Sequence, residues 1–400
     1  MGKHLSLCLA GPDSDAWWPR ARGAHRARVV DRTQRRTQSR DRHAVARPDR
    51  RPQGGLQLIS KFHLTTVSMI ALAAQIACGS NPSPASQQSP TPAAACQTVT
   101  VKSTQAGFTP SDSPTAGFTL PSGTEPVGIA LDKDGASVWV LGTGFDQVIH
   151  VADTGQATTY QLQKSGLGIQ LSQGSDGTVW VPEQYRDAIA GIGADGSVKE
   201  CSLPGKNREP VSTSAAADRS VWVAEARGGA IAHLVDGRFT EYPIGVAGVK
   251  GAEVFADPDG GAWFTVMGAP VLGHVSAQGA VERIPIGGSG TAIGVLETPD
   301  GAVWAADFGS DRLVRVARDR TQLVWNAPSG AKPQSLALGP AGVVWVTESG
   351  ADMLARVEGS ALEQMVKTGQ WPDHLVITAD GWAWFTEYYG DRVGRIRLPG

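Results

Sequence analysis

A tryptophan recurs at nearly constant spacing from about residue 120 to the end of the chain, and it constrains the fold more than any other feature. Each copy follows an apolar residue, and an acidic residue usually stands three positions later. Successive copies are 41, 42, 41, 41, 41 and 39 residues apart. Self-similarity at such a period predicts a repeat architecture in which each unit packs on the next. The copies are Trp139, Trp180, Trp222, Trp263, Trp304, Trp345 and Trp384.

Each repeat contains four short predicted β-strands. A typical unit has an apolar strand, a turn often marked Asp-Gly, the tryptophan strand, a third strand such as Asp-Arg-Leu-Val-Arg-Val and a fourth such as Thr-Glu-Tyr-Pro-Ile. Apolar and β-branched runs separated by Gly and Asp are typical of strands. With 49 glycines and only 18% charged residues, the composition favours tight turns over long helices. Residues 117–400 are therefore predicted to form an all-β, seven-bladed β-propeller of four-stranded blades.

The last repeat lacks a segment for its outer strand, because only a few residues follow its third strand. Residues 117–121, Gly-Phe-Thr-Leu-Pro, resemble an outer strand placed ahead of the first repeat. We therefore expect this N-terminal strand to complete the last blade, which closes the ring and removes the exposed sheet edges. The repeated tryptophans are expected to pack between adjacent blades, since every copy must solve the same packing problem.

Three segments of different composition precede the repeats. Residues 1–56 are rich in arginine and poor in apolar residues, which predicts a disordered leader, or a stretch upstream of the true translation start. Residues 57–78 place Lys61 ahead of an apolar run from Leu64 to Ala77, which is the layout of a signal peptide. Residues 79–116 are rich in Pro, Ser, Ala and Gln and are expected to form a flexible tether.

The cysteines indicate an exported protein. Residues 76–80, Ile-Ala-Cys-Gly-Ser, resemble a bacterial lipobox, although Gln75 replaces the usual aliphatic residue. Cys78 is thus the expected lipidation site of a protein anchored to the membrane in the cell envelope, with simple secretion or an uncleaved anchor as the alternatives. Cys96 and Cys201 either form a disulfide, which persists in oxidising compartments, or are two unrelated buried thiols. No C-x-x-C pair is present, which argues against a thiolate metal site.

The charged residues of this chain are expected to stabilise the fold and not to bind a highly charged partner. A net charge of −2 gives no electrostatic basis for a nucleic-acid partner, and a monomer is expected. The position three residues after the tryptophan is often acidic and the position eleven after it is often basic, so we expect ion pairs within a blade. The first set is Gly142, Glu183, Glu225, Val266, Asp307, Glu348 and Glu387. The second set is His150, Gly191, His233, His274, Arg315, Arg356 and Arg395.

Function is expected where one repeat departs from the others. The inner strand of a propeller blade lines the central channel. Most repeats have a small residue on this strand, six positions before the Asp of the following turn or its equivalent. Glu253 and His374 are the two exceptions. The full set is Gly128, Gly168, Ser212, Glu253, Gly294, Ser335 and His374.

The predicted strand pairing gives His374 further weight. Because the first two strands of the last repeat run antiparallel about Asp380-Gly381, we expect His374 to lie beside Glu387 at one mouth of the channel. A histidine next to a carboxylate, with Glu253 reaching in from another repeat, has the groups for a general base beside a hard-cation site. The alternative is that His374 only caps the channel by bonding to Glu387. The aromatic residues expected near this mouth, as ligand contacts, are Trp371, Tyr388 and Tyr389.

The repeat resembles that of the virginiamycin B lyase (streptogramin lyase) family. The shared pattern is P-x-G-I-A, D-G, V-W-V-x-E and D-x-(V/L)-x-R-(V/I), and the last repeat matches it best, with Asp380-Gly381, Trp384-Phe385-Thr386-Glu387 and Val393-Gly394-Arg395-Ile396. The resemblance implies a seven-bladed propeller over residues 117–400. It also implies an enzyme that linearises a cyclic depsipeptide antibiotic at its ester bond by elimination, with a magnesium ion and a histidine base.

Position by position, the resemblance assigns the base to His374 and the metal-associated glutamate to Glu387. Two positions depart from the family pattern. Ser335 stands where a second histidine is expected, and Pro372 stands where an acid is expected just before the base. The same repeat also occurs in envelope proteins with no known activity.

Three functions remain open from the sequence. The first is a lyase in which His374 takes the proton and Glu387, with Glu253, holds Mg²⁺. The second is a noncatalytic binding module that presents its loop face to a small cyclic peptide or another ligand outside the cytoplasm. The third is a lactone hydrolase, for which a ring of channel carboxylates is expected and only Glu253 is found on the inner strands.

Overall fold

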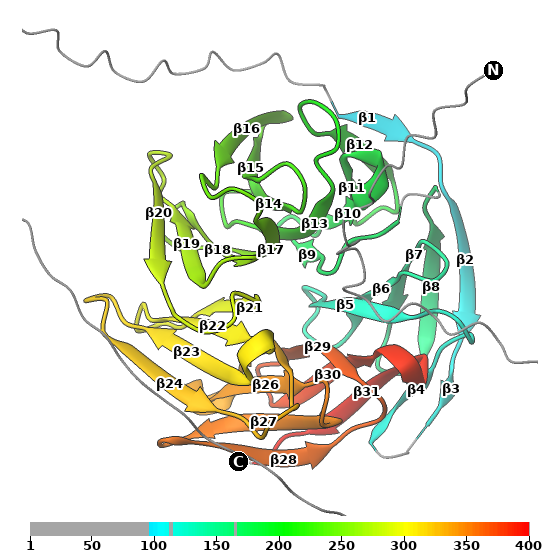
Figure 1. The fold of residues 1–400 in the computed structure, drawn as a ribbon. Coiled ribbons are helices and arrows are strands. Elements are labelled where there is room, and N and C mark those ends of the chain that lie inside the picture. Colours follow the sequence, from blue (N-terminus) through cyan, green and yellow to red (C-terminus); the bar gives the residue numbers. More distant parts are fainter. Residues whose placement is uncertain (1–95, 112–114, 164–165, 400) are drawn as a thin grey trace, which may run out of the picture. The chain divides into compact units, whose positions relative to one another are not determined.

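The computed structural model describes residues 96–111, 115–163 and 166–399. The predicted leader, the signal peptide and Cys78 lie outside these residues. Seven antiparallel sheets surround a central axis and form an all-β propeller, as the repeat predicts (Figure 1). In the described part of the chain, no helix has the length and apolar character needed to cross a membrane.

We name the four strands of a blade A to D from the channel outwards. The A strands are β5 (Pro126–Leu131), β9 (Ser172–Gln173), β13 (Pro210–Ala215), β17 (Lys250–Ala256), β21 (Ala292–Glu297), β25 (Pro333–Leu338) and β29 (Pro372–Ile377). The B strands are β6 (Val138–Gly142), β10 (Val179–Glu183), β14 (Val221–Glu225), β18 (Ala262–Met267), β22 (Val303–Asp307), β26 (Val344–Glu348) and β30 (Trp382–Glu387).

The outer strands complete each sheet in chain order. The C strands are β7 (Gln147–Val151), β11 (Ala188–Ile192), β15 (Ala230–Val235), β19 (Val271–Val275), β23 (Arg312–Val316), β27 (Met353–Glu358) and β31 (Arg392–Arg397). The D strands of the first six blades are β8 (Gln156–Gln161), β12 (Val198–Ser202), β16 (Arg238–Pro243), β20 (Val281–Pro285), β24 (Gln322–Asn326) and β28 (Ala361–Lys367).

The repeated tryptophans pack between blades, as predicted. Each one belongs to a different hydrophobic cluster that it shares with the following blade. Trp222 of β14, for example, packs with Phe264 of β18, and both side chains are fully buried. Each seam thus buries a large aromatic side chain together with aliphatic residues of both blades, which stabilises the ring.

The residue eleven positions after the tryptophan does not pair with the acid. Three histidines in this set stack on the indole ring and two arginines lie over it, namely His150, His233, His274, Arg315 and Arg395. The residue at this position lies directly opposite the tryptophan on the adjacent strand, as Trp222 does with His233, whose ring centroids are 3.8 Å apart. The predicted ion pair is therefore wrong for these two positions. In blade five, Asp307 instead pairs with Arg312, which lies opposite it across β22 and β23 at 3.0 Å.

The N-terminal strand β4 (Ala116–Thr119) completes the last blade, as predicted. It pairs antiparallel with β31 and is itself paired with β3 (Thr109–Pro110). Phe118 from β4 packs against Trp384, so the closing strand also enters the core between the last and first blades. Figure 1 shows β3 and β4 beside the last blade, with its strands β29 to β31.

Residues 97–110, which composition assigned to the tether, belong to the propeller. β1 (Gln97–Val99) pairs with β12, and β2 (Lys102–Gly107) pairs with β8, so both add a fifth strand to the outside of a blade. A disulfide joins Cys96 to the buried Cys201 of β12. The boundary predicted at residue 116 is corrected accordingly, because polar side chains suit an edge strand whose outer face meets solvent.

An aspartate in the B–C connection fixes the start of the next blade. The Asp391 carboxylate accepts hydrogen bonds from the backbone N–H groups of Gly123 and Glu125, at 2.7 and 2.9 Å. Asp311 does the same for Gly330 and Lys332. Both aspartates have left-handed backbone conformations, which Asp tolerates better than most residues. This explains the recurring Asp that begins the third strand of the repeat.

Replacement of Trp222 by alanine tests the role of the inter-blade cores. Loss of a fully buried tryptophan is expected to lower the free energy of unfolding by about 3–5 kcal/mol. Chemical denaturation monitored by circular dichroism measures the change. Leu323→Ala is the control, because Leu323 is 50% exposed and its truncation should change stability by about 0.5 kcal/mol or less. Equal effects of the two substitutions would contradict the assignment.

Replacement of Cys96 by serine tests the disulfide. The bridge closes a segment of 105 residues, and its loss is expected to lower the free energy of unfolding by about 2–5 kcal/mol because the unfolded chain gains freedom. Denaturant titrations with and without a thiol reductant provide the measurement. The reductant should destabilise the unsubstituted chain and leave Cys96→Ser unaffected, whereas a reductant effect of equal size on both would rule out this bridge.

Candidate functional site in the central channel

A β-bulge turns the side chain of His374 into the channel. Pro372 lies opposite Glu387 and Leu375 lies opposite Phe385, so β29 carries one more residue than β30 between these pairs. A bulge of this kind bends the strand and redirects a side chain. Register shifts at the same place occur in blades one and three to six. The bulge that directs this side chain into the channel therefore recurs in most blades. Only the last blade has a histidine at that position.

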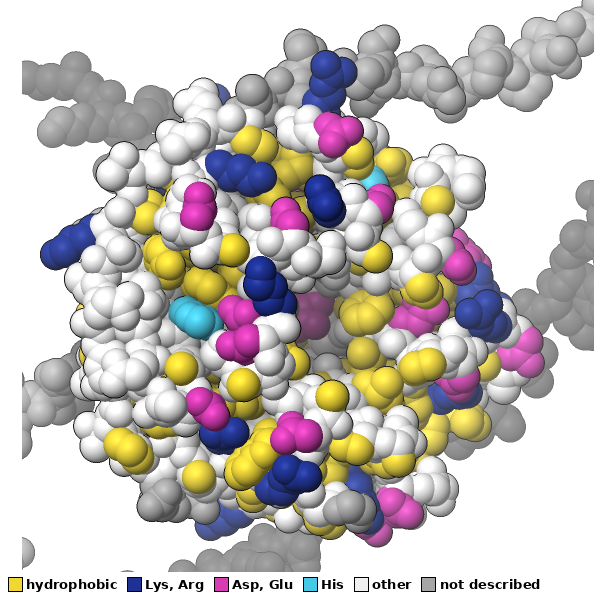
Figure 2. Space-filling model, turned by 180° about the vertical axis from the view of Figure 1, so that it is seen from behind, with side chains coloured by type: hydrophobic (Ala, Val, Ile, Leu, Met, Phe, Trp, Pro, Cys, Tyr) yellow, Lys and Arg dark blue, Asp and Glu magenta, His cyan; other side chains and the backbone are white. Residues whose placement is uncertain are grey.

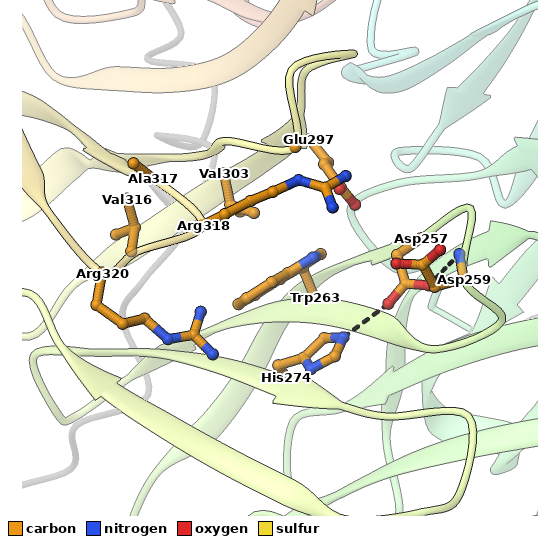
Figure 3. Close-up of a pocket in the computed structure, with 11 residues that line it drawn as sticks. Asp257, Asp259, Trp263, His274, Glu297, Val303, Val316, Ala317, Arg318 and Arg320 are labelled. Atoms are coloured by element: carbon orange, nitrogen blue, oxygen red, sulfur yellow. Dashed lines mark hydrogen bonds and ion pairs between the residues drawn. The ribbon is translucent and has the colours of Figure 1, made fainter.

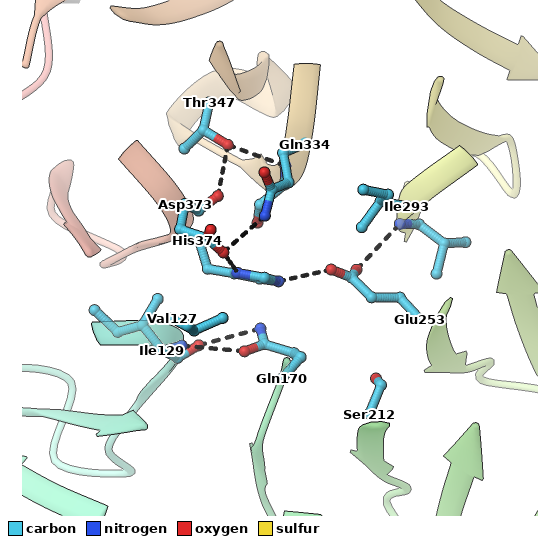
Figure 4. Close-up of polar contacts among 12 residues, drawn as sticks. Val127, Ile129, Gln170, Ser212, Glu253, Ile293, Gln334, Thr347, Asp373 and His374 are labelled. Atoms are coloured by element: carbon cyan, nitrogen blue, oxygen red, sulfur yellow. Dashed lines mark hydrogen bonds and ion pairs between the residues drawn. The ribbon is translucent and has the colours of Figure 1, made fainter. Parts of the chain in front are cut away.

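His374 forms the centre of a buried chain of polar side chains. Its Nδ1 lies 2.5 Å from Asp373 Oδ1, and its Nε2 lies 2.7 Å from Glu253 Oε1 of β17 (Figure 4). Gln334 Nε2 donates a further hydrogen bond of 2.7 Å to Asp373 Oδ1. His374 and Asp373 are 0% exposed, and Glu253 is 6% exposed. The chain therefore links blades four, six and seven across the channel.

This environment favours the protonated imidazole. Burial by itself would lower the pKa of His374, because it disfavours the charged ring. The hydrogen bonds and negative charges of Asp373 and Glu253 outweigh burial and raise the pKa from 6.5 to about 10. At neutral pH both ring nitrogens then carry a hydrogen, and each donates to a carboxylate. In this arrangement His374 has no free nitrogen with which to accept a proton.

Threonines on the B strands hold the bulges in place. Thr386 Oγ1 accepts a hydrogen bond from the His374 N–H at 3.1 Å and donates one to the Val127 carbonyl of the next blade. Thr265 and Thr347 make the equivalent contacts in blades four and six. Each threonine stands two residues after the repeated tryptophan. The blades with threonine here are those with Glu253, Ser335 and His374, a sequence signal that marks the polar sector of the channel.

Glu387 does not lie beside His374, contrary to the prediction. Its Oε1 accepts a hydrogen bond of 2.6 Å from Arg392 Nη1 and one of 3.1 Å from the Gly369 N–H. Arg392 also bonds to Thr115, so this pair belongs to the ring closure. Burial raises the pKa of the Glu387 carboxyl, although Arg392 acts to lower it. The strand register accounts for the difference, because Leu375 pairs with Phe385, which sets His374 level with Thr386, and Glu387 lies opposite Pro372 beyond the bulge.

The other channel positions are only partly as expected. Ser212 and Ser335 lie at the predicted level, where each hydroxyl accepts a backbone N–H from the next blade. In blade two, Gln170 rather than Gly168 fills the channel and bonds to both backbone groups of Ile129. The connection before β9 is longer than in the other blades, so counting along the sequence places Gly168 instead of Gln170 at the channel position. Asp373 also escaped prediction, although a charged residue in an apolar inner strand was a signal for it.

The predicted aromatic residues do gather on the face formed by the B–C connections. Trp371 lies 5.7 Å from Tyr389, and Tyr389 lies 4.9 Å from Tyr388, between ring centroids. Phe308 of blade five adds a fourth ring 6.5 Å from Trp371. Tyr388 is buried against Glu125, and burial together with that carboxylate raises the pKa of Tyr388 above its usual range. Tyr389 is 45% exposed. We call these four residues the aromatic mouth.

Glu387, Glu253 and His374 do not fit a shared Mg²⁺ site. Magnesium prefers several oxygen ligands that can approach it together. Here Glu387 is bonded to the Arg392 guanidinium, and Glu253 is bonded to the His374 ring. Among the described residues, three candidate ligand atoms come together only at Asp132, Asp134 and His150, at a turn of blade one. Each of the two glutamates is thus bonded to a side chain of the protein, Glu387 to Arg392 and Glu253 to His374.

The fold and this site define a class of protein: a seven-bladed propeller whose channel is crossed by a buried histidine–carboxylate chain. The model of the virginiamycin B lyase family matches residues 89–306. This stretch is more than half of the chain, and the protein belongs to this family. The matched stretch ends within blade five, before Ser335, His374 and Glu387.

Individual relatives support the same fold. Virginiamycin B lyase from Nocardia farcinica is 31% identical over 136 residues, which make up 34% of this chain and 47% of that protein. The chain therefore matches about half the length of this curated relative. Virginiamycin B lyase from Staphylococcus aureus has a TM-score of 0.65 at 22% identity, covering 75% of this chain and 100% of that one. A catalytically inactive variant of it, solved with quinupristin, has a TM-score of 0.66 at 21% identity and covers 74% and 100%.

The protonation of His374 can be measured directly. Because its folded pKa is raised above the unfolded value, its contribution to stability is full below about pH 6.5 and is lost as pH rises toward about 10. Nuclear magnetic resonance with nitrogen-15-labelled histidine should show one imidazole that keeps both ring hydrogens from pH 6 to pH 9. Glu253→Gln should lower this pKa. An imidazole of His374 that titrates near pH 6.5 would refute the arrangement.

Proposed function

We propose that this chain is a noncatalytic, ligand-binding propeller of the virginiamycin B lyase family. Its ligand, a small cyclic peptide or another extracytoplasmic molecule, lies over the aromatic mouth. The observation that carries the proposal is the state of His374, the residue that the resemblance assigns as the base. It is fully buried, and carboxylates occupy both ring nitrogens. A general base needs a free nitrogen within reach of the substrate proton.

The other family positions support the same conclusion. Glu387, the expected metal-associated acid, bonds to Arg392 in the ring closure. Ser335 and Pro372 supply neither the second histidine nor the preceding acid of the family pattern. Glu387 and His374, which the resemblance assigns to catalysis, are thus engaged by other side chains of the propeller in this chain.

The aromatic mouth supports binding of a ligand with apolar surface. Aromatic rings offer a large contact area with little loss of side-chain freedom, and they are frequent in binding sites. Trp371 is held in place through its backbone N–H, which donates to Asp352 Oδ1 at 2.8 Å. Lys332 Nζ lies 5.5 Å from the Phe308 ring centroid, where it also pairs with Asp311 at 3.2 Å, and places an N–H donor group beside the rings. The mouth therefore suits a peptide with aromatic groups and carbonyl oxygens.

The disulfide supports export. A bridge between Cys96 and Cys201 is stable where thiols are oxidised, as outside the cytoplasm. We extend the proposal to a protein anchored in the cell envelope through lipidation of Cys78, with the residues between Cys78 and Cys96 as the tether. β1 begins directly after Cys96, so the bridge fixes the tethered end of the propeller to blade two.

The second candidate is the lyase, and its support is membership of a family that contains virginiamycin B lyases. In this alternative His374 would release its proton to solvent and then take the proton that the substrate loses in the elimination. The alternative requires that the bonds of His374 to Asp373 and Glu253 open when substrate binds. It therefore predicts that activity rises as His374 loses its proton at high pH.

Quinupristin is a suitable probe for both candidates. The full chain is mixed with it in Mg²⁺ or in EDTA, and the products are separated by liquid chromatography with mass detection, because elimination yields a linear isomer of equal mass. We expect binding and no linear isomer. Tyr389→Ala should weaken binding about tenfold, as loss of an aromatic anchor does. Tyr185→Ala is the matched control, since Tyr185 occupies the same B–C connection in blade two and is 73% exposed.

Two results would overturn this proposal. A linear isomer that forms with Mg²⁺ and disappears in His374→Ala would establish the lyase. Binding that is equally weakened by Tyr389→Ala and Tyr185→Ala, or by neither, would remove the ligand from the aromatic mouth.

A further inference from the structure

The central channel contains a second, separate candidate site. A cavity of about 370 Å³ is lined by A-strand residues of all seven blades, including Leu131 and Ile377 next to the A–B turns. These turns lie on the face opposite to the aromatic mouth. Figure 2 shows that face, which is hollowed at its centre. The cavity is large enough for a small organic molecule.

Glu253 is the one charged residue among the described side chains that line this cavity. Its Oε1 accepts the hydrogen bond from His374, and its Oε2 has only a long contact of 3.4 Å with the Val295 N–H. The chain thus contains two acidic side chains, Asp373 and Glu253, for the single imidazole ring of His374, and no lysine or arginine is among the described residues that line the cavity. An uncompensated charge at the edge of a low-dielectric cavity favours a cation.

The walls of the cavity select the rest of the ligand. Blades four to seven contribute aliphatic side chains such as Val254, Val295, Leu336 and Leu375. On the opposite wall the hydroxyls are already engaged, as Ser172 Oγ and Thr213 Oγ1 lie 3.1 Å apart. A hydrated metal ion gains nothing from aliphatic walls, and a single carboxylate is too few ligands for a divalent metal. An apolar tail does gain from them.

We propose that the channel binds a slender organic cation, a primary alkylammonium group with an apolar tail, whose nitrogen reaches Glu253 from the A–B turn face. The ammonium donates to Glu253 Oε2 and offsets the negative charge of the polar chain, while the tail packs along Val254, Leu336 and Leu375. This site is independent of the proposed function, because the aromatic mouth lies on the other face and shares no residue with it.

A second cavity shows why charge balance matters. It has a volume of about 220 Å³ and lies between blades four and five (Figure 3). Its acids, Asp257, Asp259 and Glu297, face Arg318, Arg320 and His274. His274 already pairs with Asp257 at 2.7 Å, and Arg320 pairs with Glu282. Two arginine side chains thus already share that cavity with its acids, whereas no lysine or arginine is among the described residues that line the channel cavity.

Hexylammonium chloride is the probe, with 1-hexanol as its neutral match and ammonium chloride as the head group alone. Isothermal titration calorimetry of the full, oxidised chain at pH 7 should show that hexylammonium binds about tenfold or more tightly than 1-hexanol or ammonium. Its affinity includes both a hydrogen bond to a charged group and burial of an apolar tail, and each of the other two ligands lacks one of these. Glu253→Gln should reduce hexylammonium binding by a similar factor. Glu282→Gln, which removes an exposed carboxylate on the outer strand of blade four, should leave it unchanged.

Leu338→Trp gives an independent test, because Leu338 lies in the cavity wall but outside the His374 chain. A bulky ring there should narrow the channel and abolish binding, even if Glu253→Gln disturbs folding. Equal affinity for hexylammonium and hexanol would overturn the role of charge, and equal affinity for ammonium would overturn the role of the walls. Unchanged binding in a folded Leu338→Trp protein would place the ligand elsewhere.

Discussion

Closure of the ring is the constraint on which the rest of the structure depends. The last blade obtains its outer strand from β4, and the interaction is fixed by backbone pairing with β31, by Phe118 against Trp384 and by Arg392 between Glu387 and Thr115. Because each blade buries its tryptophan only against the next one, an open ring would expose a complete seam. The side chain of Glu387, which the resemblance assigns to metal chemistry, is therefore committed to holding the two ends together.

The channel depends on the same repeated geometry. The bulge in the A strands directs one side chain per blade inwards, and small residues there keep the ring narrow: Gly294, for example, has no room for a Cβ, which would meet the Gln334 carbonyl oxygen at 2.2 Å. Where larger residues occur, they bond to one another. Glu253 and His374 lie on blades that are far apart in sequence, and they meet because the ring brings the inner strands of its blades around one axis.

The two faces of the propeller then differ in chemistry. The B–C connections present aromatic rings and Lys332, which suits a ligand with apolar groups and carbonyl oxygens. The A–B turns open on an aliphatic channel that ends in a single carboxylate. The buried polar chain separates the two regions, and its satisfied hydrogen bonds favour a rigid constriction over a reactive site. A family fold can thus keep its shape while its site residues take structural roles.

The sequence by itself determined the blade number, the strand order, the inter-blade position of the tryptophans and the closing strand, because these follow from local patterns with a fixed period. It also singled out His374 and Glu253 as departures from the repeat. Only the tertiary structure decided which side chains contact one another in the channel. The register of β29 against β30 placed His374 level with Thr386 instead of Glu387, and a longer connection in blade two brought Gln170 into the channel. Pairing across the axis joined His374 to Glu253, 121 residues away. Such contacts depend on register and on closure of the ring, which no local pattern in the sequence records.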